Sequence, residues 1–246
     1  MNDDFNAEKE KNRIIGWIRD WFKKNGPGAS AVIGISGGKD SSIVAALCVE
    51  ALGRDMVIGV LIPNGVQRDI GDAERLVRHL GIKSYTININ GAYEAIQEAL
   101  TEAGLTNTQP EQQNLPPRLR MSVLYAVAQD LPGGGRVANT CNLSEDYIGY
   151  STKYGDSAGD MSPLAEYTVT EVLEIGDELN LPYDLVHKTP SDGLCGMTDE
   201  ENFGFSYSVL DKYIRTGICD DEDIKNKIDR MHEMNKHKLE LMPVCK

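Results

Sequence analysis

Basic residues are scarce in this sequence, and no long apolar run occurs in it. The 246 residues include 25 Lys and Arg against 38 Asp and Glu, which gives a formal net charge of −13. A protein that binds nucleic acid offers a basic surface to the phosphates, so this charge argues against that class of function. A membrane-spanning helix needs roughly 18 consecutive apolar residues, which the sequence nowhere provides. We expect no nucleic-acid partner and no membrane association.

Cysteine is also sparse. The five cysteines are odd in number and widely spaced, and no C-x-x-C pair occurs among them. Such a pattern argues against a disulfide framework and against a zinc site. Residues 1–11 are polar and charged, which is not typical of a signal peptide. Both observations favour a cytoplasmic protein with reduced thiols.

Short apolar segments alternate with amphipathic ones along the first half of the sequence. This alternation predicts βαβ units, whose crossovers are right-handed and whose strands are mostly parallel. We therefore expect a single α/β domain over residues 1–246, with a Rossmann-like, doubly wound sheet flanked by helices. The predicted strands cover 31–35, 56–62, 82–89 (nearer an edge) and 136–140, and the predicted helices cover 14–22, 43–52, 69–80, 93–103, 118–131, 206–215 and 223–238.

Three segments lack a clear period. Residues 104–117 are rich in Asn, Thr, Gln and Pro and predict a loop, and 149–159 and 188–204 predict two long irregular stretches. Loops of this length in a compact enzyme are usually functional or disordered. The apolar stripe of the first predicted helix fits either the core or a subunit contact.

The most informative segment follows the first predicted strand. Glycines at the carboxyl end of a parallel strand let backbone N–H groups face a ligand, and the next helix adds the positive end of its dipole. This arrangement suits an anion such as pyrophosphate, and Mg²⁺ would reconcile Asp40 with the phosphates. The alternative is a glycine turn in which Asp40 and Ser41 only cap the helix. The segment consists of Gly34, Ile35, Ser36, Gly37, Gly38, Lys39, Asp40 and Ser41.

Two other motifs match parts of this segment. A Walker A loop requires Ser or Thr after its lysine, but Asp40 follows Lys39, and Gly34 stands one residue too close to Gly38. The G-x-S-x-G nucleophile elbow is matched, and it would make Ser36 the nucleophile of a serine hydrolase. Against that hypothesis, only one predicted strand precedes the loop, and the sequence has no His-Gly-Gly oxyanion segment.

Residues 36–41 resemble the SGGxDS pyrophosphate loop of the ATP-pyrophosphatase superfamily, which is adenine nucleotide alpha hydrolase-like. Later segments resemble one of its families, the ammonia-dependent NAD synthetases. This second resemblance extends from about residue 14 to the C-terminus. It is carried by Pro63, Gln67, Asp69, Asp72-Ala73, Asn114, Arg118, Arg120-Met121, residues 139–145 (NTCNLSE), 149–156 (GYSTKYGD), Asp160, 188–192 (KTPSD) and His237-Lys238.

The resemblance implies a carbon–nitrogen ligase of NAD biosynthesis that uses ATP as co-substrate and Mg²⁺ as cofactor. The nicotinate carboxylate of deamido-NAD attacks the α-phosphorus of ATP and releases pyrophosphate. Ammonia then displaces AMP from the acyl adenylate and gives NAD. A free carboxylate is a poor acyl donor because its leaving group would be oxide, whereas AMP is a good leaving group. The first step needs little acid–base chemistry from side chains and therefore depends mainly on positioning and charge neutralisation.

The resemblance also assigns the site residues. Mg²⁺ would be held by Asp40 and Glu145, and ATP would contact residues 34–41 with Thr140 and Ser191. The expected contacts of deamido-NAD are Arg118, Arg120, Tyr150, Lys153, Asp160, His237 and Lys238. Taken alone, Glu145 is an ordinary acid of a first helical turn, Arg118 a solvated residue at a helix start, and Lys153 a surface lysine.

Asp156 is the candidate for the amidation step. Ammonium dominates at neutral pH and must lose a proton before it attacks. A carboxylate beside the acyl carbon would bind this cation and accept or relay its proton. We therefore expect Asp156 to form the ammonium site.

Two positions depart from the family. The resemblance places a lysine that many relatives use for ATP on Val169. Either Lys39, where many relatives have a neutral residue, or another cation compensates for it, or phosphate binding is weaker here. Ser151 replaces an aromatic residue, which leaves Tyr150 to stack on the nicotinate ring. Glutamine-dependent relatives carry a glutaminase domain, for which 246 residues leave no room, so we expect free ammonia as the donor.

The resemblance further implies a homodimer with deamido-NAD across its interface, and small molecules as the other partners. Two alternative functions share the superfamily fold. A tRNA-modifying ligase would carry a basic RNA-binding extension or paired cysteines, and neither is seen. A non-catalytic nucleotide sensor would be expected to lack Asp40 or Glu145, and both are present.

Overall fold

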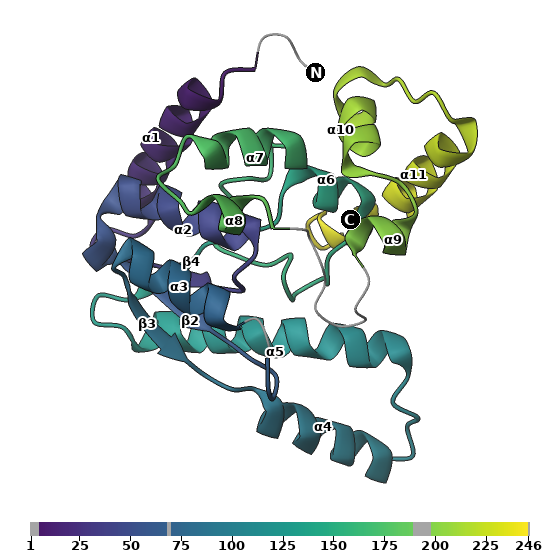
Figure 1. Ribbon diagram of the computed structural model, residues 1–246. Coiled ribbons are helices and arrows are strands. Elements are labelled where there is room, and N and C mark those ends of the chain that lie inside the picture. The colour runs from purple at the N-terminus through teal and green to yellow at the C-terminus, as the bar shows by residue number, and fades with distance from the viewer. Residues whose placement is uncertain (1–4, 68–69, 189–197, 246) are drawn as a thin grey trace.

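A computed structural model describes residues 5–67, 70–188 and 198–245 of the chain. Within these ranges, parallel strands form one sheet (Figure 1). Their order in the sheet is β3-β2-β1-β4. The chain moves outward from β1 through β2 to β3 and then crosses back to β4, which confirms the predicted α/β, doubly wound fold. The strands are β1 (Ser30–Gly34), β2 (Val57–Leu61), β3 (Lys83–Thr86) and β4 (Gly135–Val137).

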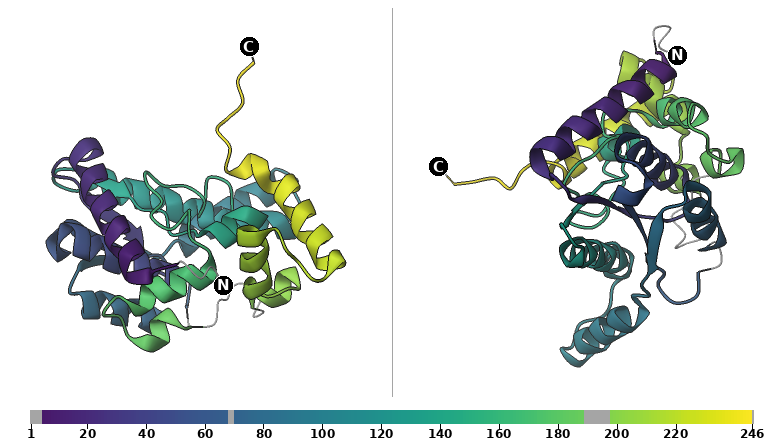
Figure 2. Two further views of the ribbon diagram at one scale, coloured as in Figure 1. Left: turned by 90° about the horizontal axis from the view of Figure 1, so that it is seen from above. Right: turned by 90° about the vertical axis from the view of Figure 1, so that its left-hand side faces the viewer.

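Helices cover both faces of this sheet (Figure 2). No helix in the described ranges has the length and apolar character of a membrane span. The helices are α1 (Ala7–Asn25), α2 (Lys39–Leu52), η1 (Arg54–Met56), α3 (Ile70–Leu80), α4 (Asn90–Glu102), α5 (Gln109–Asp130), α6 (Leu143–Ile148), α7 (Val169–Asp177), α8 (Tyr183–Val186), α9 (Asp199–Phe203), α10 (Tyr207–Thr216), α11 (Glu222–Asn235) and η2 (Lys236–Lys238).

Successive residues of the central strand β1 face opposite sides of the sheet. Ala31 and Ile33 enter the apolar cluster that α1, α2, α3 and α7 cover, whereas Val32 enters the cluster that α5 covers. All three are fully buried. A continuous apolar run is typical of a parallel strand that is covered on both faces, which explains why residues 31–35 predict β1.

The apolar stripe of α1 belongs to the core of this chain. Ile14, Ile15, Ile18 and Phe22 are at most 4% exposed and lie in the same cluster as α2. Trp17 is 42% exposed. The stripe was predicted to lie either in the core or at a subunit contact, and the structure shows that it lies in the core.

The start of α5 differs from the prediction. The helix begins at Gln109, so the predicted loop 104–117 is wrong over most of its length. Pro110 is tolerated because the first turn needs no N–H donor. Pro116 and Pro117 lie inside the helix and leave two carbonyls of the preceding turn without a donor. The polar, proline-rich composition obscured the helix.

The stretch predicted as irregular between residues 188 and 204 contains α9. Thr198 and Glu201 form a capping box that starts this helix, and the prediction overlooked this signal. Residues 189–197 lie outside the described ranges. The third strand, β3, is shorter than predicted and lies at an edge, as its alternating pattern indicated.

Asp211 of α10 fixes α6 and α7 relative to each other. The Ser144 hydroxyl donates to Asp211 Oδ1 at 2.5 Å, and the Thr170 backbone N–H donates to Oδ2 at 2.8 Å. Burial raises the pKa of Asp211, and these hydrogen bonds partly offset that effect. The position of α6 matters because this helix carries Glu145.

Candidate functional site

The loop after β1 is closed by its own serines. Ser36 Oγ lies 3.0 Å from Ser41 Oγ, and the Gly38 N–H donates to Ser36 Oγ at 3.1 Å. The hydroxyls of Ser41 and Ser42 both donate to the Gly38 carbonyl, at 3.2 and 2.7 Å. These bonds lead the chain from β1 into α2 in one tight turn. The N-terminus of α2 therefore lies at the carboxyl end of the central strand, where its dipole favours an anion.

Gly37 lets this turn pass close to α3. Its φ of +81° lies in the left-handed region, which residues with a side chain adopt only at a cost. A Cβ at this position would stand 2.9 Å from Ala73 N and from Asp72 Cβ. Both conformation and space therefore require glycine here.

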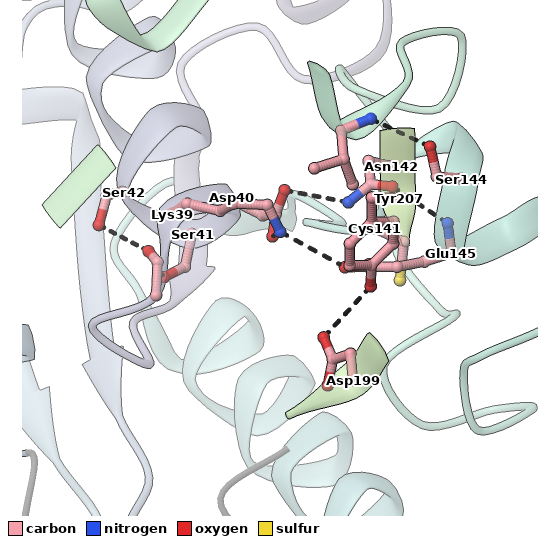
Figure 3. A network of polar contacts seen from close by, with 12 residues as sticks. Lys39, Asp40, Ser41, Ser42, Cys141, Asn142, Ser144, Glu145, Asp199 and Tyr207 are labelled. Atoms are coloured by element: carbon pink, nitrogen blue, oxygen red, sulfur yellow. Dashed lines mark hydrogen bonds and ion pairs between the residues drawn. The ribbon is translucent and has the colours of Figure 1, made fainter. Parts of the chain in front are cut away.

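The turn into α6 forms the second element of the site. Asn142 is the N-cap of α6, and its Oδ1 accepts the Glu145 N–H at 3.1 Å. Nδ2 of the same amide donates to Asp40 Oδ1, also at 3.1 Å. One fully buried side chain thus joins the start of α6 to the first turn of α2 (Figure 3). This contact brings together the two predicted metal ligands, Asp40 and Glu145.

The ammonium of Lys39 lies between these two carboxylates. Nζ is 2.7 Å from Asp40 Oδ2 and 3.7 Å from Glu145 Oε1, and the Lys39 side chain is only 4% exposed. The centroid of the Tyr207 ring lies 5.7 Å from Nζ, and the Tyr207 hydroxyl donates to Asp199 Oδ2 at 3.2 Å. Helices α9 and α10 therefore contribute to the same site as the loop (Figure 3).

Burial and charge act in opposite directions on Lys39. Burial alone would lower the pKa of Lys39, but the carboxylates of Asp40 and Glu145 raise it above its ordinary value. Burial raises the pKa of Glu145, and the Asp40 carboxylate raises it further, while Lys39 acts against both. The site therefore gathers negative charge that a cation must balance.

A second group of charged side chains forms where η2 meets residues 149–153. Lys238 Nζ donates to two backbone carbonyls of that segment, at 2.7 and 3.0 Å. Lys153 Nζ donates to the His237 carbonyl, and Arg118 Nε of α5 donates to the Lys153 carbonyl at 3.2 Å. The structure thus brings together four residues predicted to bind deamido-NAD.

Asp156 is oriented by its own loop. The Thr152 N–H donates to Asp156 Oδ1 at 2.8 Å, and the Asn139 amide donates to the Asp156 carbonyl at 2.7 Å. The residue is accessible to solvent, yet the surrounding protein desolvates it enough to raise the pKa of its carboxyl group, against the Thr152 bond and the charge of Lys238. Burial lowers the pKa of Arg120, and the Asp156 carboxylate opposes this. Asp156 thus has two cations in its surroundings.

Two residues that were predicted to contact deamido-NAD form hydrogen bonds that anchor loops. Asp160 Oδ2 accepts the Val137 N–H at 2.7 Å, which ties the segment after Asp156 to β4. Arg120 Nε donates to the Ile62 carbonyl at 3.0 Å, beyond the end of β2. Their contacts with deamido-NAD remain predictions.

The remaining residues that the sequence analysis singled out come from different segments of the chain. Thr140 follows β4 and is half-buried. The Tyr150 ring packs edge-on against Phe203 at 5.6 Å. Val169 is 5% exposed in an apolar cluster that includes Phe203, so its side chain faces protein. Ser191 lies outside the described residues.

The geometry does not favour a serine hydrolase. Ser36 Oγ is hydrogen bonded within its loop, and each histidine ring has a hydrogen-bond partner elsewhere. The pairs are His79 with the Asn180 carbonyl, His187 with Asp177, His232 with the Tyr147 carbonyl and His237 with the Met234 carbonyl.

Three residues of the site were missing from the predicted set. Asn142 stands three residues before Glu145, and this spacing is an N-cap signal that could have identified it. Asp199 and Tyr207 come from α9 and α10. No spacing in the sequence relates them to the loop after β1, because only the packing of distant helices brings them there.

Comparisons with known proteins point to one family. Residues 10–242 match the family model described as NAD synthase. An NH(3)-dependent NAD(+) synthetase of Pyrococcus furiosus is 36% identical over 236 residues, covering 94% of this chain and 88% of that protein. An NH(3)-dependent NAD(+) synthetase of Methanosarcina mazei is 38% identical over 255 residues, covering 96% of this chain and 97% of that protein. The structure of an NMN synthetase from Francisella tularensis matches with a TM-score of 0.90 at 33% identity, covering 98% of this chain and 99% of that chain.

Replacing Gly37 should destabilise the protein. We expect Gly37→Ala to lower the free energy of unfolding by about 2 kcal/mol or more, because it combines left-handed strain with backbone crowding. The midpoint of urea denaturation measures this loss. Gly71→Ala on the facing helix is the matched control, since its Cβ meets nothing within 4 Å, and it should leave stability unchanged or slightly raised. Equal midpoints for both variants would contradict the described approach of the loop to α3.

Proposed function

The chain belongs to the NAD synthase family, whose reaction is the ATP-dependent amidation of deamido-NAD, and we propose that the site described above carries this reaction with free ammonia. The observation that supports this assignment is the Asp40–Lys39–Glu145 group. It joins the loop after β1 to the start of α6 at one end of the sheet. Ligands of open parallel sheets bind at that end.

Adenylation requires that ATP be held in line with the nicotinate carboxylate. Residues 34–41 and the N-terminus of α2 would hold the pyrophosphate. Thr140 and Ser191 would contact the rest of the nucleotide. The described residues favour this step by position and charge, and no side chain needs to act as an acid or base in it.

The residues present fit a magnesium ion. Asp40 and Glu145 offer carboxylate oxygens from two elements of the fold, and hard oxygen ligands suit Mg²⁺. In the described residues, no group of three or more His, Cys, Asp or Glu is placed to hold a metal ion, so an ion at this pair would have to take its other ligands from phosphates and water. Bound there, Mg²⁺ would neutralise phosphate oxygens as negative charge passes to the leaving pyrophosphate.

Amidation requires a deprotonated ammonia beside the acyl carbon. Asp156 would bind ammonium and accept or relay its proton. The substrate itself would lie along the second charged group, where Arg118, Lys153 and Lys238 meet. Arg120, Asp160 and His237 would complete its contacts, and Tyr150 would stack on the nicotinate ring.

A second substrate is favoured by one observation. The structural match with a TM-score of 0.90 is to a protein described as an NMN synthetase. Nicotinate mononucleotide carries the same carboxylate as deamido-NAD and lacks only the adenylyl group. The chemistry at the acyl carbon would be identical, so the two substrates would differ only in contacts remote from it.

We also propose that residues 1–246 act as one catalytic domain without a glutaminase, in the cytoplasm, where ATP is available. All cysteines in the described ranges are free thiols, which suits a reducing compartment.

A direct assay tests the function. Purified protein with ATP, Mg²⁺, ammonium and deamido-NAD should yield NAD, AMP and pyrophosphate in equal amounts. No AMP should form without deamido-NAD, because its carboxylate is the nucleophile, and glutamine should not replace ammonium. Chromatography quantifies the products, and the ratio of kcat/KM for deamido-NAD and nicotinate mononucleotide decides between the two substrates. If neither deamido-NAD nor nicotinate mononucleotide were amidated, the proposal would be refuted.

The role of Asp156 predicts a selective defect. We expect Asp156→Asn to lower kcat/KM for ammonium by about 100-fold, because a neutral amide binds the cation more weakly than a carboxylate and does not accept its proton. Acyl-adenylate formation, measured by exchange of labelled pyrophosphate into ATP, should be retained. Asp130→Asn, at the exposed end of α5, is the matched control and should behave like wild type. An unchanged dependence on ammonium in Asp156→Asn would exclude this role.

We further propose that the enzyme is a homodimer, on the basis of its family. Light scattering should give a molar mass twice the 27.1 kDa of one chain. A mass of a single chain at all concentrations would contradict a dimer, and with it a substrate site across the interface.

A further inference from the structure

Lys39 differs from the other lysines proposed for the site because its ammonium is enclosed by this chain. Lys153 and Lys238 donate to backbone carbonyls. Lys39 Nζ instead contacts the Asp40 carboxylate at 2.7 Å and approaches that of Glu145 at 3.7 Å, and its side chain is 4% exposed. These two carboxylates are the proposed ligands of the divalent ion.

A further side of this ammonium faces an aromatic ring of the chain. The Tyr207 ring lies 5.7 Å from Nζ and offers its negative face to the cation. The second oxygen of Asp40 accepts a hydrogen bond from Asn142 Nδ2 at 3.1 Å. The Lys39 ammonium therefore lies between the two carboxylates in a position that the surrounding chain defines. The other carboxylate oxygen of Asp40, Oδ1, faces Asn142.

Two cations cannot share this position. An ion that joins Asp40 to Glu145 must lie within coordination distance of both carboxylates, and the ammonium already lies within hydrogen-bond distance of one of them. Like charges at such separations repel strongly when solvent is largely excluded. Metal binding to this pair therefore requires that the ammonium move away.

We propose that Lys39 is a built-in monovalent cation for the Asp40–Glu145 pair and competes with a divalent metal for these carboxylates. The inference rests on the proposed function, which makes the pair the metal site. One consequence is that the pair alone binds metal weakly. A second is that phosphate oxygens, by offering the ammonium another partner, raise the affinity for metal, so that metal and ATP bind with positive coupling.

Metal binding without nucleotide tests this competition. Mn²⁺ is the probe, and the electron paramagnetic resonance signal of free Mn²⁺ reports the bound fraction. We expect Lys39→Met to bind one ion at least about tenfold more tightly than wild type, a coupling of ordinary size. Lys39→Arg should resemble wild type because it keeps the charge. Lys24→Met, on the exposed face of α1, removes one charge far from the site and should also resemble wild type.

A second substitution localises the effect. Adding Glu145→Gln to Lys39→Met should abolish the gain in Mn²⁺ affinity. Equal affinities of Lys39→Met and wild type would overturn the proposal, as would a gain that survives Glu145→Gln.

Folding provides an independent measurement. Lys39→Met leaves two carboxylates without their cation, so its thermal midpoint should fall and should rise with Mg²⁺ more than that of wild type. If the variant folds only when Mg²⁺ is added, the proposal is supported, and if Mg²⁺ has no larger effect than on wild type, it is wrong. None of these measurements needs deamido-NAD. An enzyme that makes NAD while Lys39→Met gains no affinity would therefore defeat this inference alone.

Discussion

The ammonium of Lys39 allows two acidic side chains to meet at one end of the sheet. The carboxyl ends of parallel strands share an edge, so the segments after β1 and β4 must come together there. Asp40 and Glu145 would repel each other at that edge, and their contacts with Lys39 balance the repulsion. Removing one partner from a buried ion group typically costs about 3–5 kcal/mol. The approach of α2, α6, α9 and α10 to one another therefore depends on this charge.

Helix α6 connects the two groups of charged side chains. Its first turn presents Glu145 toward the loop after β1, and its last residue leads to Gly149, whose carbonyl accepts a hydrogen bond from Lys238. The helix has only six residues and is held by Asn142 at its start and by Ser144 through Asp211. In the proposed reaction, the acyl adenylate would contact the loop after β1 and the charged group around Lys238 at the same time. This short helix sets the spacing between them.

Local patterns in the sequence account for the sheet and for the loop after β1. Apolar runs covered on both faces and glycines at a strand end are signals contained in a few neighbouring residues. They predict β1, β2 and the helix α2, although α2 begins at Lys39 and not at residue 43. The burial of Lys39 has no such signal, because the groups that enclose it come from α6, α9 and α10. The composition around Gln109 led to the wrong prediction of a loop, because a proline suits the first turn of a helix as well as a loop. Asn142 lay within a recognised motif, and its dual role became evident only when Asp40 was placed beside it.

The enclosure of the Lys39 ammonium also sets how the site responds to temperature. The hydration free energy of charged groups becomes less favourable as temperature rises, so the penalty for keeping ions out of water declines. Apolar stabilisation, which holds the cluster around Phe203 and Tyr207, levels off under the same conditions. Heating therefore shifts the balance of forces at this end of the sheet from apolar packing toward its ions. The junction between the nucleotide loop and the C-terminal helices gains relative strength where the rest of the fold weakens.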